Sequence, residues 1–225
     1  MKKLFHILLS LFLPLCAAPA SATAFSPLQI GIDGENLQLS DAHTPVYGLR
    51  LNLPVGGNDT VGGLDVGLFS YADNFTGIRL NLQSWTAKTV RGVDISLISM
   101  GGCDDSELDG IQIAGLGVTA KLRGLQAGIV SYAATLRGLQ LALWSTASDL
   151  RGLQIGLANF ADSTHGLQLG IFNSSAPSYG TGGTVRGVQI GLVNLAGSLR
   201  GLQIGLVNVV TDSDFPCLPL LRASF

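Results

Sequence analysis

The sequence predicts an all-β protein with a single repeat domain, and it favours a parallel β-solenoid over an antiparallel barrel of the outer-membrane type. Three observations support this. One glycine recurs at intervals of 14 or 15 residues along most of the chain. Aliphatic residues alternate with polar or small ones after each of these glycines. Neighbouring units are nearly identical, since "GVQIGLVN" returns as "GLQIGLVN" after 14 residues. Near-identical neighbouring units are expected where each unit is the template on which the next one stacks.

The first element, residues 1–24, has the features of a cleaved secretory signal peptide. Lys2 and Lys3 precede an apolar run, and the small residues of "ASATAF" offer cleavage after Ala22 or Ala24. The run is shorter than the roughly 20 residues that a membrane-spanning helix needs. The chain is therefore expected to be exported, to the cell envelope, the outer membrane or the cell surface.

Residues 25–225 are predicted to form one β-repeat domain of about 12 short-strand units. A degenerate copy begins at Pro27, clear repeats cover 48–209, and 210–225 is predicted to cap the array. Intervals of 18 and 21 residues mark two insertions. The recurring glycines, called unit glycines below, are Gly48, Gly63, Gly77, Gly92, Gly110, Gly124, Gly138, Gly152, Gly166, Gly187 and Gly201.

Each unit has the pattern of a half-buried strand. Leu202, Ile204 and Leu206 in the last unit alternate with Gln203 and Gly205. We expect the aliphatic side chains to form the core and the unit glycine to adopt a backbone angle that only glycine takes easily. Asn and Ser residues that close the octapeptides are expected to form one ladder. A second ladder is expected from Gln112, Gln126, Gln140, Gln154, Gln168, Gln189 and Gln203.

The turns decide between the two architectures. Alternate strands of a barrel are not equivalent, so its turns should show a 28-residue period, yet "LRG" opens consecutive units. Three aliphatic residues per unit are also too few for an apolar band about 25 Å tall. The aromatic Phe225 at the C-terminus is typical of the barrel, which therefore stays the alternative, with a pore or anchoring role. Pro216 and Pro219 suit a cap, because proline cannot donate to a sheet ladder.

From Gly138 onward, "GLQIGLANFAD", "GVQIGLVNLAG" and "GLQIGLVNVV" resemble the repeats of bacterial surface repeat-containing proteins, as does the earlier "VYGLRLNLPVGGNDTVGGLDVGLF". The resemblance covers most of residues 25–225. It implies a location in the envelope or on the cell surface. It supplies no catalytic residue and no biochemical role.

Neither an enzyme nor a cofactor or metal site is predicted. Without Lys2 and Lys3, 11 Lys and Arg residues stand against 15 Asp and Glu residues, a net charge of −4 that does not suit nucleic acid. His43 and His165 have no metal-ligand spacing. The acidic stretch Asp104–Asp109 is expected to be a solvated loop, with a cation site as the alternative. No small-molecule substrate is indicated.

Arginine is the one charge with a pattern, because it precedes the unit glycine in most repeats. In a solenoid these residues share one edge, where like charges about 4 Å apart repel by about 1 kcal/mol even in water. A solvated edge is expected, with an anionic envelope glycolipid or polymer as the alternative ligand. This arginine row, the candidate interaction site, is Arg91, Arg123, Arg137, Arg151, Arg186 and Arg200.

Aromatic residues cluster just after the aliphatic trio. We expect them to close the core on a second face, with a contact surface for a membrane or partner as the alternative. They are Phe69, Tyr71, Trp85, Tyr132, Trp144, Phe160 and Phe172.

The two cysteines of the mature chain, Cys103 and Cys217, are expected to be free. Seven coils would separate them by about 34 Å, whereas a disulfide needs Cα atoms within about 7 Å.

Together these features predict an exported, non-enzymatic envelope or surface repeat protein that acts as a scaffold or binding surface. Its expected partners are an envelope component, a membrane surface or another copy of itself.

Overall fold

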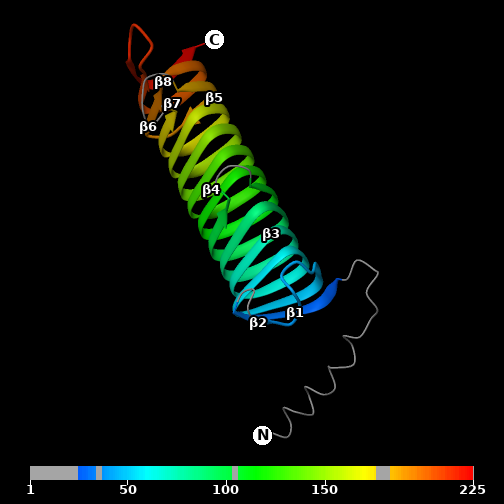
Figure 1. Ribbon diagram of the computed structural model, residues 1–225. Coiled ribbons are helices and arrows are strands. Elements are labelled where there is room, and N and C mark those ends of the chain that lie inside the picture. Colours follow the sequence, from blue (N-terminus) through cyan, green and yellow to red (C-terminus); the bar gives the residue numbers. More distant parts are fainter. Residues whose placement is uncertain (1–24, 34–36, 103–105, 176–182, 225) are drawn as a thin grey trace, which may run out of the picture.

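The computed structural model describes residues 25–33, 37–102, 106–175 and 183–224. Within them the chain winds into one slender stack of coils, with β1 and β2 at one end and β8 at the other (Figure 1). No helix occurs in these residues. The strands are β1 (Ser26–Asp33), β2 (Leu37–Gln38), β3 (Val46–Gly101), β4 (Glu107–Ser175), β5 (Thr184–Ile190), β6 (Val193–Ala196), β7 (Ser198–Val210) and β8 (Cys217–Ser224). The two longest, β3 and β4, each wind through several turns (Figure 1).

Successive coils pair in parallel, with one unit directly on the next. Gly92 of β3 faces Gly110 of β4, and Gly187 of β5 faces Gly201 of β7. Both insertions leave this register intact, since the unit glycines on either side of each still face one another. The parallel β-solenoid is confirmed, with about ten turns. The antiparallel alternative is wrong, because its neighbouring strands would run in opposite directions.

Every unit glycine has a positive φ, which confirms the backbone prediction. The angles run from 116° at Gly63 to 150° at Gly166. A side chain would be excluded for a second reason as well, because a Cβ on Gly201 would overlap the carbonyl oxygen of Gly187 in the coil before. A side chain at any unit glycine would therefore collide with the backbone of the coil before it.

The prediction of which strand face is buried was wrong. In the last coil Gln203 is fully buried, whereas Leu206 is 60% exposed. All seven glutamines of the predicted ladder lie inside, and the aliphatic side chains that alternate with them point outward. A buried amide costs little when it is hydrogen-bonded, and the stacking of identical residues gives each glutamine a partner.

The apolar part of the interior comes from a different column, two residues before each unit glycine. Leu122, Leu136 and Leu150 occupy it in consecutive coils and pack against Ala133 and Ala147 from the opposite side. In ten of the eleven coils this position holds a buried Val, Leu or Phe. The exception is the coil of Gly166, which holds Thr164 there, and its hydroxyl lies 2.6 Å from that of Ser175.

Two amide ladders run through the interior. In one, Gln126 Nε2 donates to Gln112 Oε1 at 2.6 Å, and each later glutamine donates to the one before it, as far as Gln203. In the other, Asn159 Nδ2 donates to Asn173 Oδ1 at 2.9 Å, and the bonds continue to Asn208. A hydrogen bond of this kind contributes about 1 kcal/mol net, so the ladders add to stability in each coil that carries one.

Antiparallel strands lie at both ends of the stack. β2 pairs with β1, and β8 pairs with β7. β8 is held by Arg222, whose Nη1 donates to the carbonyl oxygens of Phe215 and Pro216 at 2.9 and 3.0 Å. Cys217 is exposed and free, as predicted. Cys103 and the predicted signal peptide, residues 1–24, lie outside the described residues.

Deleting residues 215–225 should convert a monodisperse protein into an aggregating one. The deletion removes β8 and leaves the last parallel coil with unpaired backbone groups, which template pairing with another chain. Light scattering of the truncated protein, in comparison with a full-length Cys217→Ser variant, tests this. The Cys217→Ser variant keeps β8 but lacks the thiol, so a difference between the two proteins is caused by the loss of the strand and not by the loss of Cys217. A truncated protein that is as soluble and monomeric as this control would show that β8 does not protect the end.

Candidate functional site

The structure places the predicted arginine row on one edge of the stack. All six side chains are exposed, and each occupies the position just before its unit glycine. Parallel pairing aligns them, with Arg186 facing Arg200, and His165 facing Arg186. Arg91 faces Asp109, an acidic residue in the same column. The row therefore forms a line of cations that is interrupted once by a carboxylate and once by a histidine.

Only two members of the row form ion pairs among the described residues. Arg123 lies 2.6 Å from Glu107, and Arg151 lies 3.1 Å from Asp149. The other four guanidinium groups face solvent with no acidic partner in the described part of the chain. A surface depression of about 370 Å³ beside the row is lined by Glu107, Lys121, Leu122, Arg123, Thr135 and Arg137. Three of its six lining residues are basic and one is acidic.

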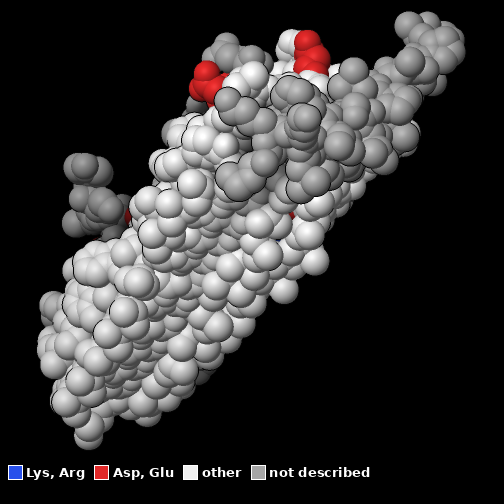
Figure 2. Space-filling model, turned by 90° about the horizontal axis from the view of Figure 1, so that it is seen from below, with Lys and Arg blue, Asp and Glu red and all other residues white. Residues whose placement is uncertain are grey.

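Beside the row lies a sheet face covered with aliphatic side chains. They stand one, three and five residues after each unit glycine, and we call this surface the aliphatic face. Its outermost column, five residues after the glycine, is 43–60% exposed in the coils that carry a large side chain there. These residues are Leu53, Leu68, Leu82, Leu97, Ile129, Leu143, Leu157, Ile171, Leu192 and Leu206. Figure 2 shows one long side of the stack on which almost every described residue is uncharged.

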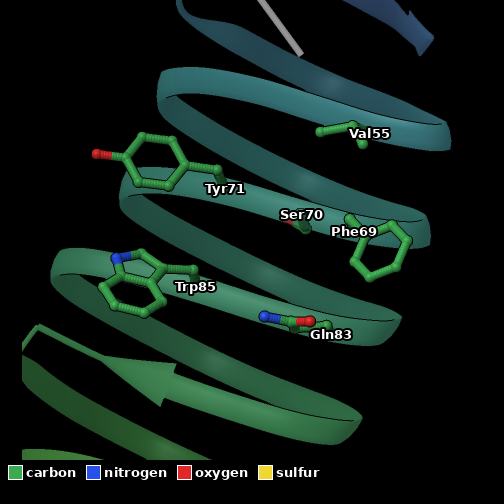
Figure 3. A pocket seen from close by; sticks show the side chains of 6 residues that line it. All are labelled: Val55, Phe69, Ser70, Tyr71, Gln83 and Trp85. Carbon is green, nitrogen blue, oxygen red and sulfur yellow. The ribbon is translucent and has the colours of Figure 1, made fainter. Parts of the chain in front are cut away.

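The aromatic cluster also lies outside, so the prediction that it closes the core was wrong. Trp144 is 51% exposed and stacks on Phe160, with ring centroids 4.7 Å apart. Tyr71 and Trp85 lie one above the other on neighbouring coils (Figure 3). With Phe69 and Val55 they line an apolar depression of about 240 Å³. This second outer face therefore also offers apolar contact area.

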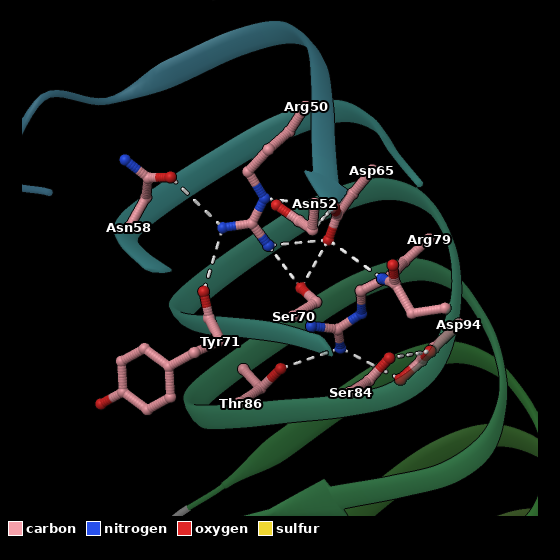
Figure 4. Close-up of polar contacts among 11 residues, drawn as sticks. Arg50, Asn52, Asn58, Asp65, Ser70, Tyr71, Arg79, Ser84, Thr86 and Asp94 are labelled. Carbon is pink, nitrogen blue, oxygen red and sulfur yellow. Dashed lines mark hydrogen bonds and ion pairs between the residues drawn. The ribbon is translucent and has the colours of Figure 1, made fainter. Parts of the chain in front are cut away.

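A column of four buried charges was missed by the sequence analysis. It occupies the glutamine position of the earlier coils and alternates in sign as Arg50, Asp65, Arg79 and Asp94. Figure 4 shows these side chains one above another inside the stack. A signal was present in the sequence, because each residue lies two positions after a unit glycine, where later coils have glutamine.

Asp65 accepts hydrogen bonds from several buried side chains. Arg50 donates to its carboxylate through Nε at 3.1 Å and through Nη2 at 2.7 Å. Asn52 and Ser70 add bonds of 2.6 Å each. Burial on its own raises the pKa of Asp65, but the charge and hydrogen bonds of Arg50, together with Ser70, outweigh it and hold that pKa below its ordinary value. Asp65 is therefore ionised in the folded protein.

The second half of the column connects the charges to the glutamine ladder. Arg79 Nη2 lies 3.0 Å from Asp94 Oδ2, and its guanidinium stands over the ring of Phe75. Ser99 donates to Asp94 at 2.7 Å and accepts from Gln112 at 2.7 Å. All four charged side chains are at most 1% exposed. This column holds coils together and admits no substrate.

The described residues contain no group of three or more His, Cys, Asp or Glu side chains placed to hold a metal ion. His43 pairs with Asp59 at 2.8 Å on the surface, far from His165 in the stack. Asp104 and Asp105 of the predicted acidic loop lie outside the described residues. In the part of the chain that the structure describes, there is also no helix of the length and hydropathy that crossing a bilayer requires.

Comparison with known proteins gives no family for this chain: no family model, no curated protein and no solved structure matches it.

Proposed function

We propose that this chain is an exported, non-enzymatic repeat protein of the cell envelope or cell surface, where it acts as a binding surface or scaffold. The exposed aliphatic face is the observation that carries this proposal. The signal-peptide pattern of residues 1–24 and the low share of charged residues, 12%, support it. The role comes from a long rigid surface rather than from a reaction site.

The aliphatic face is as large as the largest exposed apolar patch of a typical monomer. Ten stacked coils and a width of four residues give a face of roughly 50 Å by 13 Å, on the order of 600 Å². The largest exposed apolar patch on a typical monomer is about 300–600 Å² and is often functional. Here the aromatic second face adds further area. A continuous apolar surface of this extent suits contact with a membrane or a partner.

The alternative role, a pore, depended on a closed antiparallel barrel. The parallel stack removes that basis, because its interior is filled by the leucine column and the amide ladders. A pore is not proposed.

Cell fractionation tests the proposal. We expect the protein, followed with an antibody against residues 25–225, to leave the cytoplasm and to sediment with the envelope. A Leu157→Thr, Ile171→Thr and Leu192→Thr variant should shift to the soluble fraction, because it loses apolar area in three neighbouring coils while threonine keeps the strand. Circular dichroism of the variant verifies that the β-structure is retained. A wild-type protein that stays in the cytoplasm, or is released freely without binding, would overturn the proposal.

A further inference from the structure

The arginine row and the aliphatic face are adjacent from the coil of Gly92 onward. In six of these eight coils an arginine immediately precedes the unit glycine, and the first aliphatic residue of the face immediately follows it. Arg200 and Leu202, for example, lie on either side of Gly201. A line of cations therefore borders one long edge of the aliphatic face, from Arg91 in β3 to Arg200 in β7.

In three coils an aromatic side chain borders the opposite edge. Leu143, in the outermost aliphatic column, is followed by Trp144, and both are more than half exposed. Two consecutive exposed residues mark the corner at which the aliphatic face meets the second face. Phe69 and Phe172 occupy the same corner position in their coils. Tryptophan and tyrosine are the residues that concentrate at the boundary between lipid and water.

We propose that the aliphatic face rests on a phospholipid bilayer that contains anionic lipids, with the arginine row on the lipid phosphates. This proposal rests on the proposed function and names the occupant of the surface. The aliphatic side chains enter the boundary between headgroups and acyl chains, as the apolar face of an interfacial helix does. The guanidinium groups stay at the phosphate level, because arginine is suited to phosphate geometry.

The charges favour a lipid surface over a second copy of the chain. Four members of the row, Arg91, Arg137, Arg186 and Arg200, have no acidic partner among the described residues. The row's acidic neighbours Glu107 and Asp109 are already paired with Arg123, and Asp149 is paired with Arg151. A second copy would bring the same excess of cations to the interface. A bilayer with anionic lipids neutralises the whole row at once, and its plane matches a long face without a deep pocket.

Vesicle flotation tests this with the purified protein. We expect it to float with vesicles of phosphatidylcholine mixed with phosphatidylglycerol, and to bind phosphatidylcholine alone much more weakly. Added salt should weaken binding to the mixed vesicles, because it screens the row. Trp144 should report contact by a blue shift of its fluorescence, absent in a Trp144→Phe variant.

Substituting single arginines distinguishes binding by the arginine row from attraction by the net charge of the protein. Arg137→Gln, Arg186→Gln and Arg200→Gln should each weaken binding to mixed vesicles about fivefold, the equivalent of about 1 kcal/mol per basic residue near an anionic surface. Lys88→Gln is the matched control. It removes one exposed cation that lies off the row and pairs with Asp73 at 2.9 Å, so binding should stay unchanged.

Two outcomes would overturn the inference. Equal effects of Lys88→Gln and the row variants would show that net charge, not the row, attracts the protein. Failure to float with mixed vesicles, together with a dimer that the three threonine substitutions dissociate, would identify a second copy as the occupant. The proposed function would then still be tested separately, by whether the protein sediments with the cell envelope.

Discussion

An Asp65→Asn variant should unfold with a free energy about 3–5 kcal/mol lower than that of the wild type. The substitution keeps the shape of the side chain and removes its charge. Arg50, which is fully buried, then has no counter-ion at 2.7 Å and cannot reach solvent without opening the coil. Urea denaturation followed by circular dichroism measures the change.

The chain itself supplies the control for this experiment. Later coils hold glutamine in the same column, so an Arg50→Gln and Asp65→Gln double variant gives two earlier coils the buried amide of the later ones. It should be considerably more stable than Asp65→Asn, because it leaves no isolated buried charge. If Asp65→Asn were as stable as the wild type, the ion pair would contribute nothing to the stack.

The same pair should make the protein sensitive to acid. The pKa of Asp65 is lowered in the folded state, so its contribution to stability is fully present above about pH 4, the range of an unfolded aspartate. That contribution is lost as the pH falls through the lower folded pKa. The double glutamine variant should lose less stability over this range than the wild type does.

A Gly63→Ala substitution should lower the free energy of unfolding by about 3 kcal/mol or more. Gly63 has a φ of 116°, at which a side chain is strained. A Cβ there would also overlap the carbonyl oxygen of Gly48, which is backbone and cannot rotate away. The strained φ and the overlap with Gly48 act together, because the backbone of Gly63 can change its φ only if the two coils separate. Denaturant midpoints compare the variant with the wild type.

The preceding residue gives a matched control. Gly62 has no such φ, and a Cβ there would meet only the ring of Tyr47, a half-exposed side chain that can turn. Gly62→Ala should therefore change stability by less than about 1 kcal/mol. Equal losses for the two variants would show that the glycine column is not where the coils are most constrained.

The sequence correctly predicted that the units stack, but it did not predict which face of each strand is buried. The 14-residue spacing predicted which residues lie above one another, and the ladder of Gln126 on Gln112 follows from it directly. A period of two defines two strand faces and does not say which one is inside. Hydrophobicity assigned Leu206 to the core. The structure buries Gln203 instead, because stacking gives every amide a partner.

The column two residues before each glycine could have corrected this assignment. Leu136, Leu150 and their equivalents are apolar in ten of eleven coils, and they pack inside. The arginine row was predicted correctly as one edge, because an exposed charge does not depend on which strand face is buried. That the row borders an aliphatic surface could not be foreseen while the aliphatic residues were assigned to the core.

The two amide ladders point in opposite directions, and this has an electrical consequence. Glutamine side chains donate toward the N-terminal end, whereas asparagine side chains donate toward the C-terminal end. Aligned amide dipoles add along a column, as they do along a helix. From Asn159 to Asn208 the two columns oppose one another, so their dipoles largely cancel. Units that carry both amides can therefore be added to the stack without building up a net dipole along its axis.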